Sequence, residues 1–418
     1  MSGQRLFWKS VLIFIFNFGL CLGADDLPPE LANIFTVERT QELSGEALYA
    51  DIADETGDYV LILKKNNSEN TVKYFTADGI EKWQKDFAGK EAVWVDISEN
   101  SETVMVQGWG IANFFNREGT LLLTMRKYMA TYFLSPNGEY IIEKKGNSPT
   151  DIYCYNILGE RIKLSLPEKF NAPLYYARFT DDSNILALFV GQRTEPPPLP
   201  LKNRGRQRKG FFKEPLPGIE TDGHLILYDL NKNEFGWSTK LGKGEFGSLG
   251  FETQHTAVSK DHILLFIGYE EGYGLYCYTK NGDLIWRKSE QEIHSGRKMN
   301  TTSMLISKNG DKACVYGGRG DIYILEMETG NADIIMNLPL DIVRRIKLKI
   351  IDFDDKKILF SRSNPEKRTQ DNFIINLNPK GKAESSSFIE GSLFTNKGKI
   401  IYFDANSKLN ICRNGEDR

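Results

Sequence analysis

The sequence predicts an all-β protein, and three observations support that class. Short runs of β-type residues recur along the chain, a turn closes many of them, and most of the spacings between runs lie between 36 and 50 residues. A period of this length is typical of one four-stranded blade of a β-propeller. We therefore expect an eight-bladed β-propeller of four-stranded blades, with seven blades plus an extra strand pair as the alternative.

The first series of runs predicts the second strand of each blade. These runs, such as YVLILKK from Tyr59, are rich in β-branched and aromatic residues. The eight runs begin at Tyr59, Val104, Tyr140, Ile185, Ile263, Ala313, Ile358 and Ile400. One spacing, from Ile185 to Ile263, is 78 residues, which indicates an insertion within the fourth blade.

A second series of runs ends at residues suited to tight turns. The turn residues are Gly79, Gly119, Gly159, Asn233, Gly282, Gly330, Gly381 and Gly415. A hairpin that needs a positive φ favours glycine, and asparagine is the next best residue for that conformation. We therefore place these turns between the third and fourth strands of the blades.

The eighth blade lacks a fourth strand of its own, because only Glu416, Asp417 and Arg418 follow Gly415. The segment from Asn33 to Thr40 has the alternating pattern of a lone strand. Pairing of this N-terminal strand into the last blade would close the ring and cover an exposed sheet edge. The sequence thus predicts a single propeller domain over residues 25–418.

Residues 1–24 have the organisation of a signal peptide. Arg5 and Lys9 precede an apolar run of about 12 residues, which Gly23 and Ala24 follow. This run is shorter than the roughly 20 residues of a membrane-spanning helix. We expect cleavage and export to the periplasm or the cell exterior as a soluble protein. Leu20 stands before Cys21, where a lipoprotein would have a small residue, which argues against a lipid anchor.

Three tryptophans carry a family resemblance. Trp83, Trp237 and Trp286 each stand four residues after a turn residue, namely Gly79, Asn233 and Gly282. This G-x-x-x-W pattern resembles the tryptophan-docking repeat of the PQQ-like, or quinoprotein alcohol dehydrogenase-like, β-propeller superfamily. The resemblance implies that the indoles pack between adjacent blades. The corresponding places in other blades hold Leu123, Lys163, Ile334 and Ser385.

Catalytic members of that superfamily hold their quinone beneath a vicinal disulfide and beside a calcium ion. This chain has no Cys-Cys pair, its four histidines fall in no metal-binding pattern, and it has no G-x-S-x-G elbow. Cys154, Cys277 and Cys412 lie in strand-like contexts, which favours buried thiols over disulfides. We therefore expect no catalytic residue, metal or cofactor, with a quinone- or metal-dependent propeller enzyme as the alternative.

The insertion, placed at residues 192–222, is the best candidate for a partner-binding loop. It contains six prolines, which favour an extended chain. The candidate contact residues are Arg204, Arg206, Arg208, Lys209, Phe211 and Phe212. They are suited to an acidic protein, a glycan or a membrane surface, and a solvated loop without function is the alternative.

The charge of the chain restricts its partners. A formal net charge of -3 gives no reason to expect nucleic-acid binding. The sequence as a whole predicts a monomeric, exported, non-catalytic scaffold that binds a protein, in the cell envelope or outside the cell.

Overall fold

The structure is a computed structural model. It describes residues 35–128, 130–145, 152–164, 174–180, 183–190, 221–244, 256–259, 261–269, 272–293, 301–307, 309–317, 321–337, 348–353, 357–364, 369–377, 383–389, 392–396, 399–403 and 408–414. These residues form eight four-stranded antiparallel sheets, here called blades 1 to 8. The one helix among them, α3 (Glu290–Ile293), is a single turn. The all-β prediction is therefore confirmed.

Blades 1 to 4 follow one another along the chain. Blade 1 consists of β2 (Glu46–Ile52), β3 (Tyr59–Lys64), β4 (Glu69–Phe75) and β5 (Glu81–Ala88), and blade 2 of β6 (Trp94–Ile97), β7 (Thr103–Gly108), β8 (Ile111–Asn116) and β9 (Leu121–Arg126). Blade 3 consists of β10 (Ala130–Leu134), β11 (Tyr140–Lys145), β12 (Ile152–Asn156) and β13 (Arg161–Ile162), and blade 4 of β14 (Leu174–Phe179), β15 (Ile185–Val190), β16 (Thr221–Asp229) and β17 (Glu234–Gly244).

Blades 5 to 7 repeat this order. Blade 5 consists of β18 (Thr256–Val258), β19 (His262–Tyr269), β20 (Gly272–Thr279) and β21 (Leu284–Ser289), and blade 6 of β22 (Thr301–Ile306), β23 (Lys312–Gly317), β24 (Asp321–Glu326) and β25 (Ala332–Asn337). Blade 7 consists of β26 (Leu348–Phe353), β27 (Lys357–Asn364), β28 (Thr369–Leu377) and β29 (Ala383–Ile389).

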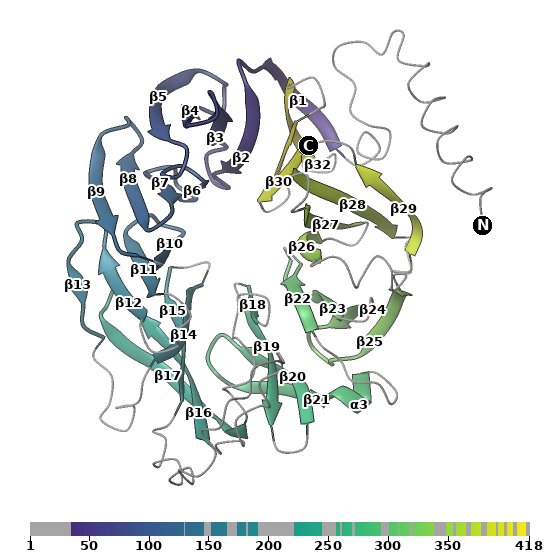
Figure 1. The fold of residues 1–418 in the computed structure, drawn as a ribbon. Coiled ribbons are helices and arrows are strands. Elements are labelled where there is room, and N and C mark those ends of the chain that lie inside the picture. The colour runs from purple at the N-terminus through teal and green to yellow at the C-terminus, as the bar shows by residue number, and fades with distance from the viewer. Residues whose placement is uncertain are drawn as a thin grey trace, which may run out of the picture.

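Blade 8 combines the two ends of the described chain. Its strands are β30 (Ser392–Asn396), β31 (Lys399–Phe403), β32 (Lys408–Asn414) and β1 (Phe35–Glu42), in that order. β1 runs antiparallel to β32, with Phe35 opposite Asn414 and Glu42 opposite Lys408. In Figure 1 the purple β1 lies beside yellow strands for this reason.

The blades surround a common centre, as Figure 1 shows. The first strand of each blade lies innermost, and β2 contacts β6 while β22 contacts β26. Burial follows this arrangement. All six residues of the second strand β7 are buried, whereas only Trp83 is buried in the outer strand β5. A sheet covered on both faces needs continuous apolar runs, and this explains why the second strands gave the clearest sequence signal.

The hydrophobic core lies between successive blades rather than inside each one. A cluster between blades 1 and 2 joins Val60 and Ile62 to Val95 and Val104. Between blades 8 and 1, an equivalent cluster joins Leu61 to Ile401, Phe403, Leu409 and Ile411. Each blade therefore depends on its neighbours to bury its faces.

The two ends of the blades differ in construction. Turns between first and second strands, and between third and fourth strands, lie at what we call the turn end. Turns between second and third strands, and the connections from blade to blade, lie at the connection end. At the turn end, successive blades are joined by main-chain hydrogen bonds, such as Glu55 N to Glu99 O at 3.1 Å and Glu99 N to Pro136 O at 2.8 Å.

No helix among the described residues is long and apolar enough to cross a membrane. The predicted signal peptide at residues 1–24 lies outside the described residues and stays a prediction.

Candidate interaction face

Trp83 lies between blades 1 and 2. Its indole Nε1 donates a hydrogen bond to the carbonyl of Arg117 at 3.2 Å, and its ring stacks on Tyr74 with centroids 5.5 Å apart. The ring also covers Gly119, where a Cβ would lie 2.7 Å from the indole. Only glycine fits beneath this tryptophan, and the φ of +79° at Gly119 suits glycine as well.

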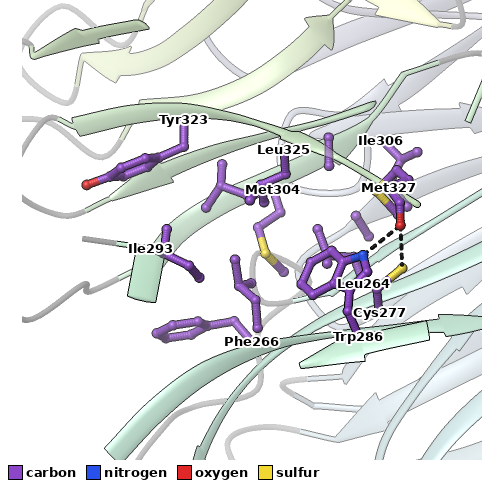
Figure 2. Close-up of a cluster of buried hydrophobic side chains, with 14 residues drawn as sticks. Leu264, Phe266, Cys277, Trp286, Ile293, Met304, Ile306, Tyr323, Leu325 and Met327 are labelled. Carbon is purple, nitrogen blue, oxygen red and sulfur yellow. Dashed lines mark hydrogen bonds between the residues drawn. The ribbon is translucent and has the colours of Figure 1, made fainter. Parts of the chain in front are cut away.

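Trp237 and Trp286 repeat the same contact in later blades. Trp237 Nε1 donates to the carbonyl of Lys280, and the ring covers Gly282. Trp286 Nε1 donates to the carbonyl of Met327 at 2.6 Å, a bond drawn in Figure 2. Its ring covers Gly330.

Two other side chains occupy the docking position. Leu123 covers Gly159, and the guanidinium of Arg39, from β1, covers Gly79. The six turn residues within the described chain all have positive φ, including Asn233 at 53°. The tryptophans and turn glycines therefore hold blades together, with Trp83 and Trp286 buried and Trp237 partly buried.

The predicted binding loop lies mostly outside the described residues, as do all six of its candidate contact residues. It leaves the fold at Val190, the end of β15, and the chain returns at Thr221. The last two residues of the predicted insertion, Thr221 and Asp222, belong to β16 and pair with Gly244 and Lys243. As a connection between second and third strands, it starts and finishes at the connection end.

A Gly-Trp-Gly turn at the connection end of blade 2 presents an exposed tryptophan. Trp109 lies between β7 and β8 and is 78% exposed. The backbone N of Trp109 donates to the carbonyl of Lys90 at 2.8 Å, and N of Lys127 donates to the carbonyl of Gly110 at 2.9 Å. The turn is thus fastened on both sides by the neighbouring blade connections.

Each glycine of this turn permits one of these close contacts. A Cβ at Gly108 would collide with the backbone of Lys90 and Glu91. Gly110 has a φ of +73°, and a Cβ there would lie 3.1 Å from the carbonyl oxygen of Lys127. The tryptophan between them is therefore held in a fixed place without packing into the core.

Tyr128 adjoins this turn and is 85% exposed. It lies in the connection from blade 2 to blade 3, where its Cα would be 3.5 Å from a Cβ on Gly110. Tyr128 and Trp109 are the two most exposed large hydrophobic side chains of the described residues. Trp94, at the start of β6 and at the same end of blade 2, is 36% exposed.

Charged groups continue this surface onto blade 3. The ammonium of Lys127 forms an ion pair with the buried carboxylate of Glu143 and lies 4.7 Å from the ring centroid of Tyr153. The guanidinium of Arg161 lies 4.3 Å from the same centroid. These are cation–π contacts, which order the ring and both cations.

Two carboxylates meet at the inner strands of blades 1 and 2. Asp51 Oδ2 accepts a hydrogen bond from the backbone N of Ile97 at 2.8 Å. Burial, followed by repulsion from Asp96, raises the pKa of Asp51 well above its ordinary value, and burial raises the pKa of Asp96 to about 6. Both groups belong to the junction between blades 1 and 2, and because they interact, their two pKa values belong to the pair.

Three cysteines of the described residues, Cys154, Cys277 and Cys314, are buried free thiols, and burial raises the pKa of Cys154 to about 12. For Cys154 and Cys277 the strand contexts in the sequence indicated this state. No group of three histidine, cysteine or acidic side chains within the described part of the chain could hold a metal ion.

The sequence interpretation missed Trp109, Tyr128 and the Asp51–Asp96 pair, although signals for them existed. A tryptophan between two glycines occupies a turn where asparagine, aspartate or glycine is usual. The dipeptide Asp-Ile ends both β2 and β6, at residues 51 and 96, in register with the blade repeat. A search for unusual turn residues and for polar residues repeated at strand ends would have found them.

Comparison with known proteins identifies the fold. No family model matches the chain, and no curated protein does. Among solved structures, a eukaryotic initiation factor is similar with a TM-score of 0.51 at 9% identity, over 87% of this chain and 83% of that one. BamB from Moraxella catarrhalis has a TM-score of 0.48 at 13% identity, over 91% and 98% of the two chains. Hsv2 from Kluyveromyces lactis has 0.48 at 10%, over 82% and 99%.

These similarities concern architecture alone. The eight four-stranded sheets, together with the similarity to the initiation factor, show that the chain has a β-propeller fold. Membership of the PQQ-like superfamily in particular stays a prediction.

Proposed function

We propose that this chain is an exported, non-catalytic β-propeller scaffold that binds a protein partner at the connection end of blades 2 and 3. The observation that carries the proposal is the exposure of Trp109, on a turn that two glycines and two main-chain hydrogen bonds hold in place, and of Tyr128 in the adjoining blade connection. Exposed rings on a fixed backbone lose little conformational entropy on binding, and tryptophan and tyrosine dominate the energetics of protein interfaces.

The alternative, a solvated turn without function, does not account for the residue choice. A turn between two β-strands is served by small polar residues, and a tryptophan that is 78% exposed contributes little to the core. The nearby tryptophans Trp83 and Trp286 are buried, so the chain uses the same residue type for two different purposes.

Site-specific photo-crosslinking in the native host tests the proposal. A photoreactive benzoylphenylalanine replaces Tyr128 in one strain and Lys82, an exposed residue of the outer strand β5, in the other. We expect irradiation to yield a discrete protein adduct from position 128 and none from position 82. Equal adducts from both positions, or none from position 128, would contradict binding at this face.

Two further measurements address export and catalysis. N-terminal sequencing of the protein from the host is expected to start just after Gly23 or Ala24, and an intact Met1 in the cytoplasm would refute export. Addition of pyrroloquinoline quinone and calcium is expected to give no saturable absorbance change, whereas dye-linked oxidation of an alcohol or sugar would favour the enzyme alternative.

A further inference from the structure

The exposed aromatic residues belong to a longer strip in which hydrogen bonds, cation–π contacts and the chain itself connect one residue to the next. Lys90 hydrogen bonds to Trp109 through its carbonyl, and Gly110 to Lys127. The Lys127 ammonium then lies over Tyr153, whose ring also meets the guanidinium of Arg161. We define the cationic strip as Lys90, Trp109, Arg126, Tyr128, Tyr153 and Arg161. It runs from the connection end of blade 2 to the outer strand of blade 3.

The strip carries an excess of positive charge. Lys90, Arg126 and Arg161 are exposed, and none of them forms an ion pair within the part of the chain that the structure describes. Arg126 pairs in register with Ile111, two residues from Trp109, so its place beside the aromatic turn is fixed by the sheet. Lys127 is different, because the buried Glu143 already balances its charge.

We infer that the cationic strip binds an acidic segment of a partner protein, an inference that rests on the proposed scaffold function and names the chemistry of its partner. Carboxylates of such a segment would pair with the exposed cations Lys90, Arg126 and Arg161. Its apolar side chains would lie against Trp109 and Tyr128. Charge complementarity of this kind directs association and selects partners, while the aromatic contacts supply most of the affinity.

An anionic membrane surface would offer similar charge, but the geometry favours a protein segment. The cations and rings follow one another along a line over two blades, and Arg161 lies on the outer strand rather than at the connection end alone. A flat bilayer would meet the loops of one end, whereas a peptide chain can follow the line.

The test uses the mature full chain and a short fluorescent peptide of alternating glutamate and leucine. Two further peptides carry glutamine or lysine in place of glutamate. The protein variants are Lys90→Glu with Arg126→Glu, and a matched control, Lys82→Glu with Lys288→Glu, which makes the same charge change on β5 and β21. Circular dichroism and thermal unfolding establish that both double variants are folded.

We expect the acidic peptide to bind, the affinity to fall with added salt, and the strip variant to bind about tenfold or more weakly because attraction becomes repulsion. The control variant should bind like the parent protein, and the strip variant should gain binding of the lysine peptide. Equal binding of the glutamine and glutamate peptides, or an unchanged strip variant, would overturn the inference. Binding of phosphatidylglycerol vesicles without binding of the peptide would also overturn it.

The inference and the proposed function fail in different ways. A Tyr128 adduct that persists in the strip variant, together with absence of peptide binding, refutes an acidic partner and leaves the scaffold function standing. Absence of both the adduct and peptide binding removes the scaffold function as well.

Discussion

The junction between blades 1 and 2 and the junction between blades 8 and 1 solve one packing problem with different residues. At the first, Trp83 covers Gly119, and at the second, Arg39 covers Gly79. Trp83 is buried and donates to the next blade, whereas Arg39 is only partly buried. The docking position therefore holds a large side chain that covers a glycine with positive φ, and tryptophan, leucine and arginine all meet this need.

The difference indicates where each junction obtains its stability. The junction between blades 1 and 2 also has Asp58, which accepts hydrogen bonds from Tyr74 at 2.6 Å and from Arg117 at 2.7 Å. The closing junction has a hydrogen bond from Tyr59 to Gln41 at 2.9 Å in its place, and Gln41 belongs to β1, which pairs with β32 inside blade 8. Side chains form both junctions, but at the second junction one of the partners is held in place by the pairing of the two ends of the described chain.

Deletion of residues 25–43, which removes β1, should have the largest effect. Blade 8 would lose its outer strand, and the edge of β32 would be open to pairing with another molecule. We expect loss of the cooperative unfolding transition and aggregation, measured by thermal unfolding and size-exclusion chromatography. A monomeric deletion variant that melts at the parent temperature would show that β1 is dispensable for closure.

Trp83→Ala should destabilise the protein by about 3–5 kcal/mol, the usual cost of truncating a buried tryptophan. The change leaves a cavity above Gly119 and removes the hydrogen bond to Arg117. Denaturation by guanidinium chloride measures the loss of stability. Trp83→Leu should be the milder variant, because Leu123 already occupies the equivalent position over Gly159. A loss below about 1 kcal/mol for the alanine variant would show that this docking contact adds little.

Asp58→Ala should cost roughly 2–3 kcal/mol, because it leaves the buried hydroxyl of Tyr74 and the guanidinium of Arg117 without their acceptor. Arg117 is one-third exposed, so water replaces part of the loss. The double variant Asp58→Ala with Tyr74→Phe should recover some stability in the same unfolding assay. Additive losses would contradict the shared hydrogen bond.

Arg39→Ala should cost about 1 kcal/mol or less, since a partly exposed cation gains little from its surroundings. The expected loss is therefore much smaller than the loss expected for Trp83→Ala, although both side chains occupy the docking position. Arg39→Lys provides the control, as it keeps the charge and loses the flat guanidinium. A loss as large as that of Trp83→Ala would show that side-chain docking governs the closing junction too.

One further expected effect depends on pH and concerns the inner end of the junction between blades 1 and 2. The pKa of Asp96 is raised to about 6 by burial, above the value of about 3.9 in an unfolded chain. The folded state therefore binds more protons between these values, and the free energy of unfolding should fall as the pH rises through about 6. Asp96→Asn should reduce this dependence when unfolding is followed between pH 4 and 7. If the free energy of unfolding of Asp96→Asn had the same pH dependence as that of the parent protein, the Asp51–Asp96 pair would not be its source.

The repeat could be predicted from the sequence because buried second strands and turn glycines are local signals. The strands that begin near Tyr59 and Ile263 and the turn at Gly282 could be predicted without knowing which residues lie next to them in space. The contacts between blades could not be predicted in this way. Nothing in the local sequence of Arg39 says that it covers Gly79, and the exposure of Trp109 depends on two connections that fasten its turn. These features of the candidate site thus depend on contacts that form only when neighbouring blades are assembled.

The pairing of β1 with β32 also affects the order in which the blades can be completed during synthesis. A hydrogen bond from Thr40 to Asn410 joins positions 370 residues apart, so β1 is made long before its partner exists. During synthesis, β1 has no partner in blade 8 until residues 408–414 have been made. Blade 8 can therefore be completed only after the strands of the seven other blades have been synthesised, and contacts so distant in sequence are expected to form slowly.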